Sequence, residues 1–215
     1  MVNLCLYWST GSCGDIINYL ITSQGYNTIN VNTIIDSNGK VSSSYNEIFL
    51  SKIKNDVTLI REWNSTELEE IKKESPFMIG THRLDQCNFI KNYFKDQIKT
   101  IGITYTANSY EKILRNWIKK VGIYDTKLVT DFSKDKILID KLKEKNLYDE
   151  YLVKKFMEYT HNYILKEVPN TFDINLPFEL IQSGDIDSIA ALLDISISTE
   201  TKEFFNVWVS KQEKF

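Results

Sequence analysis

Short apolar runs alternate along this chain with segments in which apolar residues recur every three or four positions. Val2–Trp8 is a run of strand-forming residues, followed by a Gly/Ser-rich turn and by helix-periodic positions from Ile16 to Ile21. Phe77–Gly80 and Ile98–Tyr105 are further apolar runs of strand length. The pattern predicts a strand, a turn and a helix in that order, and then further strands separated by helices.

The same criteria predict the remaining elements. Ser65 or Thr66 is the expected cap of a charged helix, and a polar loop with an Asn38-Gly39 turn is expected from Asp36 to Ser44. The other expected strands are Asn27–Ile35, Val57–Arg61 and Phe172–Leu176, and the other expected helices are Tyr45–Lys54, Asp85–Phe94, one capped by Ser109, two within Asp135–Lys166, Asp185–Leu193 and Thr199–Val209.

Strands that alternate with helices predict an α/β fold, in which a mostly parallel sheet carries helices on both faces. With 215 residues and 42% hydrophobic residues, the chain is long and apolar enough for one packed domain over residues 1–215. It is too apolar for wholesale disorder.

Charge and cysteine content exclude several classes of function. Lys and Arg total 26 against 29 for Asp and Glu, a net charge of −3, so no nucleic-acid or anionic-membrane partner is expected. The three cysteines lack zinc-ligand spacing and are too few for a disulfide framework, so no metal is expected. Without a visible signal peptide or an apolar run of membrane-spanning length, the expected location is the cytoplasm.

The turn after the first strand is the first candidate site. It consists of Ser9, Thr10, Gly11, Ser12, Cys13, Gly14 and Asp15. Its glycines allow main-chain N–H groups to turn inward at a helix N-terminus, and its hydroxyls can donate to phosphate or sulfate oxygens. The turn opens the chain as a P-loop-like, three-layer nucleotide-binding architecture would, although the Lys-Ser/Thr of a complete phosphate-binding motif is absent. The alternative is an ordinary tight turn in which Asp15 serves the helix.

A second candidate site follows the strand that ends near Gly80. Ligands of parallel sheets bind beyond the carboxyl ends of the strands, and His82 and Arg83 stand at such an end. His82 is one of two histidines. The other, His161, lies in a Lys- and Glu-rich helical stretch typical of a surface position.

These segments resemble the sulfotransferases that use 3′-phosphoadenosine 5′-phosphosulfate. The resemblance rests on the strand–turn–helix opening, the segment Phe77–His82 with its Thr-His pair, the strand Ile101–Tyr105 before a helix near Ser109, and a similar tail over Asn175–Ile195. It implies sulfuryl transfer from that donor to a hydroxyl or amine of a small-molecule or glycan acceptor. His82 would be the catalytic base, the turn Ser9–Asp15 would hold the phosphosulfate, and Ser109 would contribute to the 3′-phosphate site.

The chain departs from the family pattern at three places. The turn lacks the usual basic residue, Tyr105-Thr106-Ala107 replaces the usual Arg-Asn-Pro, and no glycine-rich C-terminal clamp is visible. Arg83, Arg115 or a nearby Lys are the candidates for the missing positive charge. The alternatives are a nucleotide or nucleoside-monophosphate kinase, a nucleotide-sugar glycosyltransferase, and a non-catalytic binding or assembly module on a degenerate P-loop fold. Burial of Trp63 and Trp117 would argue against an aromatic partner surface.

Overall fold

A computed structural model describes the main chain over most of the sequence. The described residues are 2–9, 12–28, 32–35, 41–44, 63–124, 140–141, 143–145, 150–151 and 167–212. Contacts divide the chain into a larger compact unit, Met1–Trp8 with Cys13–Thr104 and Pro169–Phe215, and a smaller one, Ser9–Ser12 with Tyr105–Val168.

A parallel five-stranded sheet organises the larger unit. Its strands follow the order β2-β5-β1-β6-β7, and every neighbouring pair is parallel. The strands are β1 (Asn3–Tyr7), β2 (Asn27–Thr28), β5 (Phe77–Thr81), β6 (Ile98–Thr104) and β7 (Ile174–Pro177). The predicted parallel sheet is confirmed, and the runs that begin at Val2, Phe77 and Ile98 are three neighbouring strands of it.

The three central strands are apolar because both faces of the sheet are covered. Every residue of β5 is buried, as are all but the first residue of β1 and all but Lys99 of β6. Leu6 of β1 lies between Gly80 and Ile101 in register. Strands buried on both faces have continuous rather than alternating apolar sequences, which explains the short apolar runs.

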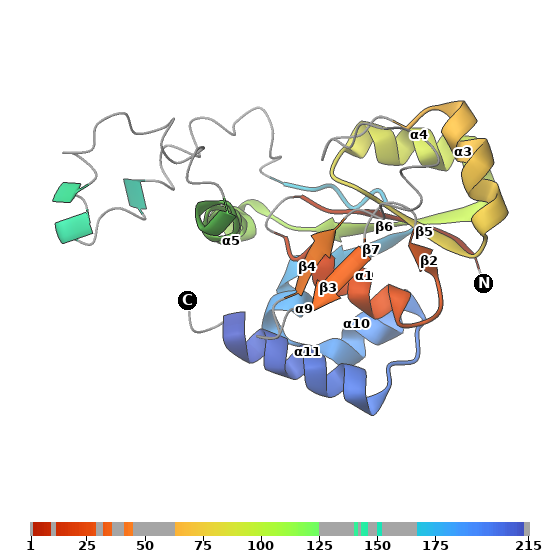
Figure 1. Ribbon diagram of the computed structural model, residues 1–215. Coiled ribbons are helices and arrows are strands. Elements are labelled where there is room, and N and C mark those ends of the chain that lie inside the picture. Colours follow the sequence, from red (N-terminus) through yellow and green to blue (C-terminus); the bar gives the residue numbers. More distant parts are fainter. Residues whose placement is uncertain are drawn as a thin grey trace. The chain divides into compact units, whose positions relative to one another are not determined.

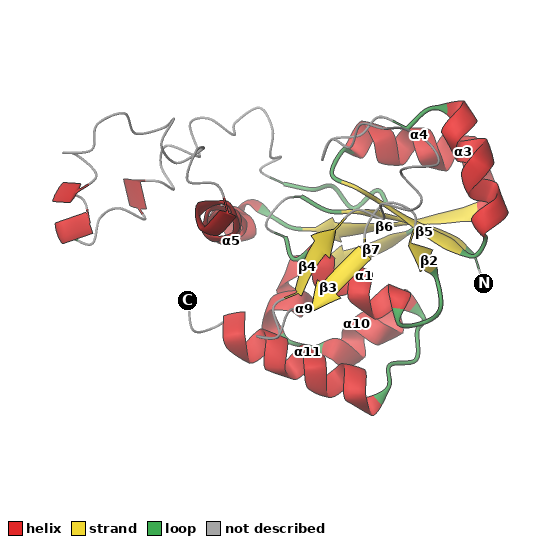
Figure 2. Cartoon of the chain, viewed as in Figure 1, coloured by secondary structure: helices red, strands yellow, loops and turns green. Residues whose placement is uncertain are grey.

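Helices cover both faces of this sheet (Figure 1; strands are yellow and helices red in Figure 2). One face carries α3 (Ser65–Ile71) and α4 (Leu84–Phe94), with α4 packed against β1, β5 and β6. The other face carries α1 (Gly14–Thr22), α9 (Phe178–Ser183), α10 (Ile186–Leu193) and α11 (Thr199–Gln212). The short 3₁₀ turns η1 (Lys72–Glu74) and η2 (Lys95–Gln97) follow α3 and α4. The predicted α/β architecture with two helical layers is therefore confirmed.

The region predicted as one strand over Asn27–Ile35 is divided. Residues 27–28 form β2 of the main sheet, whereas β3 (Asn32–Ile35) pairs antiparallel with β4 (Val41–Ser44) in a separate ribbon. The predicted loop up to Ser44 is therefore wrong at its end. Val-Ser-Ser-Ser has little apolar signal, and it forms a strand because β3 supplies its hydrogen-bonding partner.

Several helix boundaries also differ from expectation. Asn64 rather than Ser65 or Thr66 caps α3, and α5 (Ala107–Tyr124) begins two residues before Ser109. The segment after the last strand forms α9, a helix that the sequence pattern does not predict. The expected helix Tyr45–Lys54, the strand Val57–Arg61 and most of Asp135–Lys166 lie outside the described residues. None of the helices described in the structure is both long and apolar enough to cross a membrane.

Candidate active site

The carboxyl end of β1 is the centre of the candidate site in the larger unit. β1 lies between β5 and β6. The chain leaves β1 toward the β2 and β5 side, whereas it leaves β6 toward β7 on the opposite side. Such a reversal of strand order opens the place at the edge of a parallel sheet where ligands bind.

His82 is docked on the main chain at the end of β1. Its Nδ1 lies 2.9 Å from the Trp8 carbonyl oxygen, and the Trp8 N–H donates to the Thr81 carbonyl over 3.2 Å. A carbonyl only accepts hydrogen bonds, so Nδ1 carries a proton in this arrangement. In the neutral ring the lone pair is therefore on Nε2.

Trp8 joins His82 to the start of α1. Its indole meets the imidazole edge-on, with ring centroids 4.5 Å apart. A Cβ added to Gly14 would lie 2.1 Å from Trp8 Cγ, so the indole packs directly on the main chain where α1 begins. His82 and the glycine at the helix start thus lie at one edge of the sheet. Gly11 itself, like Thr10, lies outside the described residues.

The hydroxyls of the turn bond within the smaller unit. Ser12 Oγ donates to the Ser9 carbonyl over 2.7 Å, and the Tyr105 hydroxyl donates to Ser9 Oγ over 2.8 Å. The Ser12 N–H also bonds to the Ser9 carbonyl, at 3.0 Å. Ser12 therefore closes the turn with both its main-chain and side-chain donors.

Cys13 and Asp15 occupy the start of α1. Cys13 is the N-cap and has left-handed backbone angles (φ 63°, ψ 28°) without a side-chain capping bond. Asp15 is buried and is the second residue of the helix, where a carboxylate interacts favourably with the helix dipole. The Ile16 N–H donates to the Cys13 carbonyl over 3.2 Å, which closes the first turn of the helix.

Arg83 is half-buried at the N-cap of α4 and forms an ion pair with Asp85. Its Nε donates to Asp85 Oδ1 over 3.0 Å, and its Nη2 contacts Oδ2. The guanidinium holds the pKa of the Asp85 carboxyl below its ordinary value, chiefly through the side-chain hydrogen bond. Arg83 thus supplies the expected cation beside His82 in sequence, but Asp85 compensates its charge.

Ser109 and Arg115 lie on α5 in the smaller unit. The Ser109 N–H donates to the Thr106 carbonyl over 3.1 Å, within the first helical turn. Arg115 pairs with Glu111 one turn earlier, at 2.6 Å. In the larger unit, the structure brings His82 and Gly14 together through Trp8, and the Arg83 N–H bonds to the hydroxyl of Thr81. The roles of Ser109 and Arg115 stay predictions.

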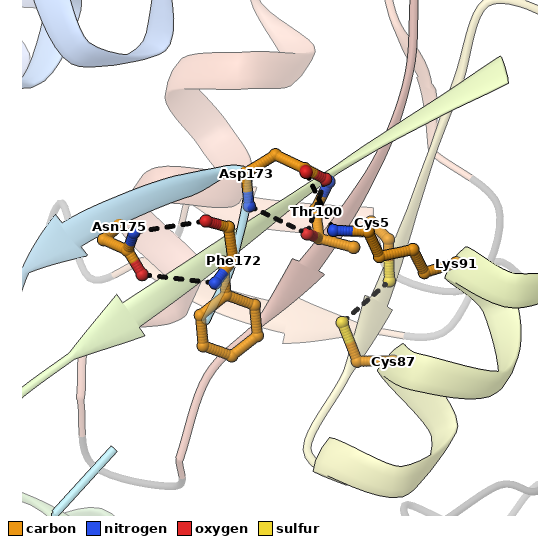
Figure 3. Close-up of polar contacts among 7 residues, drawn as sticks. All are labelled: Cys5, Cys87, Lys91, Thr100, Phe172, Asp173 and Asn175. Carbon is orange, nitrogen blue, oxygen red and sulfur yellow. Dashed lines mark hydrogen bonds and ion pairs between the residues drawn. The ribbon is translucent and has the colours of Figure 1, made fainter. Parts of the chain in front are cut away.

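A second group of polar contacts lies away from this edge of the sheet (Figure 3). Asp173 Oδ2 accepts from both the N–H and the hydroxyl of Thr100 at 2.8 Å, and its Oδ1 pairs with Lys91 at 2.8 Å. Burial disfavours the charged carboxylate, but these donors outweigh it and lower the pKa of Asp173. The group ties the start of β7 to β6 and α4, so we assign it to the fold.

Two reduced cysteines are also paired in this region. Cys5 of β1 and Cys87 of α4 are buried, with their sulfur atoms 3.7 Å apart. The hydrogen bond to Cys87, and then burial, raise the pKa of the Cys5 thiol well above its ordinary value. Both thiols therefore behave as core residues.

Sequence reasoning missed two residues that surround His82. The sequence pattern places Trp8 in a strand, and it marks Thr81 only as part of a Thr-His pair. A Trp that directly precedes a Gly/Ser turn is the signal that was available for Trp8. No such signal identifies the carbonyl that meets the imidazole, because strand register decides it.

Comparisons with protein families, with curated proteins and with solved structures found no match for this chain. Within the described part of the chain, no cluster of three or more His, Cys, Asp or Glu side chains is arranged to hold a metal ion.

Proposed function

We propose that the protein is a sulfotransferase-like enzyme with a P-loop-like phosphate site. It would transfer the sulfuryl group of 3′-phosphoadenosine 5′-phosphosulfate to a hydroxyl or amine of a small-molecule or glycan acceptor. The observation that carries the proposal is the hydrogen bond from His82 Nδ1 to the Trp8 carbonyl. It leaves the lone pair of the neutral ring on Nε2, at the sheet edge where ligands of parallel sheets bind.

His82 would act as a general base. The acceptor oxygen or nitrogen bonds to sulfur while the bond from sulfur to the bridging oxygen of the donor breaks. The proton of the acceptor passes to Nε2, and 3′,5′-adenosine bisphosphate leaves with the electron pair. A neutral imidazole suits this step because the lone pair on Nε2 can accept the proton of the acceptor group.

The donor's anionic groups would be held mainly by the main chain. The first N–H groups of α1 are suitable donors, since a helix N-terminus favours negative charge. Arg83 is a cation of the same unit, and its charge is compensated by Asp85. Because the turn lacks a basic residue, we expect weaker donor binding than in a complete member of the family.

Donor binding can be tested with 3′,5′-adenosine bisphosphate. Saturating ligand raises the apparent stability of a native protein, by about 2.7 kcal/mol at one hundred times Kd. We expect a higher melting temperature at millimolar ligand, and a smaller shift in Arg83→Ala. An unchanged melting temperature would refute the donor site.

The same melting assay separates the alternatives. A rise in melting temperature with ATP alone would favour the kinase. A rise with UDP-sugars would favour the glycosyltransferase. No shift with any nucleotide would favour a binding module. Trp63 is buried, which argues against its use on a partner surface, whereas the side chain of Trp117 lies outside the described residues.

The role of His82 can be tested by replacing it with alanine. Loss of a general base lowers the rate about 10²- to 10⁴-fold, so turnover of the donor with a phenol or amine acceptor should fall by that factor. Donor affinity and melting temperature should change little. His161→Ala is the matched control and should retain activity. Full activity in the folded fraction of His82→Ala would make His82 structural.

A further inference from the structure

We infer that Thr81 is a positioning residue that, together with the main chain of Trp8, holds His82 as the tautomer with its proton on Nδ1. The tautomer assignment stands on the geometry alone. Its consequence for catalysis rests on the proposed function.

The Thr81 hydroxyl shapes the bend that carries His82. The chain passes from the last residue of β5 to the first residue of α4 across only two residues, His82 and Arg83. Thr81 Oγ1 accepts a hydrogen bond from the Arg83 N–H over 3.1 Å, and it donates a longer bond of 3.4 Å to the Arg83 carbonyl. Threonine hydroxyls that bond two residues ahead stabilise such turns. The main chain on either side of His82 is therefore fixed by one buried side chain.

The main chain of Trp8 fixes the imidazole itself. The parallel register pairs Tyr7 with Thr81, so the next residue, Trp8, presents both of its polar groups to the bend. Its N–H bonds to the Thr81 carbonyl, and its carbonyl accepts the proton of His82 Nδ1. The indole against the ring edge restricts rotation of the imidazole.

These contacts select one of two tautomers. An imidazole in water favours the proton on Nε2, whereas the Trp8 carbonyl favours it on Nδ1. A ring with its proton on Nε2 would present a proton, rather than a lone pair, to the hydroxyl or amine that receives the sulfuryl group, and it could not remove the proton of that group. If the bend moves, the hydrogen bond of 2.9 Å from His82 Nδ1 to the Trp8 carbonyl becomes longer. The imidazole then returns to the tautomer that it favours in water, with the proton on Nε2.

Thr100 provides a matched control for Thr81. It is also a buried strand threonine, and its hydroxyl bonds to Asp173 rather than to the bend. Thr100→Val and Thr81→Val therefore remove equivalent buried hydroxyls from two strands of one sheet. Thr81→Ser retains the hydroxyl that the inference requires.

The test is the nitrogen spectrum of the imidazole in the full chain. Because the sequence has only two histidines, His161→Gln leaves His82 as the single source of ring signals. Long-range proton–nitrogen correlation spectra at neutral pH distinguish the protonated from the unprotonated ring nitrogen. The proton should be on Nδ1 of His82 in three proteins: the His161→Gln protein itself, and the same protein with Thr81→Ser or with Thr100→Val. Thr81→Val should shift the population toward Nε2–H, and turnover should fall about tenfold with unchanged donor affinity.

The outcomes separate this inference from the proposed function. An Nε2–H ring with Thr81 intact, or an unshifted ring in Thr81→Val, would overturn the inference even if sulfuryl transfer is found. The expected tautomers without any transfer from the donor would support the inference and overturn the proposed function. A shift in Thr100→Val equal to that in Thr81→Val would show a general loosening of the sheet and would also overturn it.

Discussion

At the scale of single residues, the contact between Gly14 and Trp8 sets how closely α1 approaches the end of β1. A methyl group on Gly14 would lie 2.1 Å from Trp8 Cγ, which is near the base of the side chain and cannot swing away. We expect Gly14→Ala to lower the free energy of unfolding by about 1–3 kcal/mol, the cost of overpacking. Chemical denaturation measures the loss, and near-ultraviolet circular dichroism should report the displaced indole. Unchanged stability and an unchanged spectrum would show that the contact is looser.

Residues of the candidate site could be predicted where their place in the sheet follows from their position directly after an apolar strand. His82 and the turn follow apolar runs, and parallel strands bring their carboxyl ends to one edge. The partners of these residues were not predictable. Ser12 bonds to Ser9, and Arg83 to Asp85, through local geometry that no periodicity encodes. Binding of a donor by these residues stays a prediction.

At the scale of elements, α3 owes its start to one side chain. Asn64 Oδ1 accepts from the Glu67 N–H at 3.0 Å, and the Asn64 N–H donates to Glu67 Oε2 at 3.2 Å. Asn64→Ala should therefore lower the free energy of unfolding by about 1 kcal/mol, a typical cost of losing an N-cap. Ser65→Ala is the control and should change it by only a few tenths, since Ser65 is already helical. Urea denaturation measures both losses. If Ser65→Ala lowers the free energy of unfolding more than Asn64→Ala does, Ser65 rather than Asn64 is the cap, as the sequence predicts.

Long elements with a strong apolar pattern were predicted well, and short polar ones were not. β1, β5 and β6 are buried on both faces, so each is visible in the sequence as a continuous apolar run. The ribbon of β3 and β4 depends on pairing between two short segments, which no single-segment pattern reveals. Helix α9 was missed because Pro177 precedes it and only six residues follow before Gly184.

At the scale of the larger unit, the Asp173 group makes the stability of the sheet depend on pH. Hydrogen bonds from Lys91 and Thr100 lower the folded-state pKa of Asp173 despite its burial. The stabilisation is therefore complete above the unfolded pKa of about 3.9, and it is lost as pH falls through the lower folded value. Asp173→Asn should lower the free energy of unfolding by about 1 kcal/mol at pH 7, below the usual range of about 1.5–3 kcal/mol for charged hydrogen bonds, because the carboxylate is partly exposed.

Melting temperatures between pH 7 and pH 2 measure this effect. The curve of Asp173→Asn should approach that of the unsubstituted protein as pH falls below about 4. Asp187→Asn is the control, because Asp187 forms an exposed pair with Lys202. A constant difference between Asp173→Asn and the unsubstituted protein down to pH 2 would contradict the assignment.

The strand order has a consequence for synthesis on the ribosome. β1 leaves the exit tunnel before its two partners, Phe77–Thr81 and Ile98–Thr104, which begin about 70 and about 91 residues after Tyr7. At about 5–20 residues per second, the apolar Leu4-Cys5-Leu6-Tyr7 segment waits several seconds for its neighbours. During that interval an unpaired apolar strand is a target for chaperones and for aggregation. The strand at the centre of the finished sheet is thus the one that nascent-chain quality control has to shield longest.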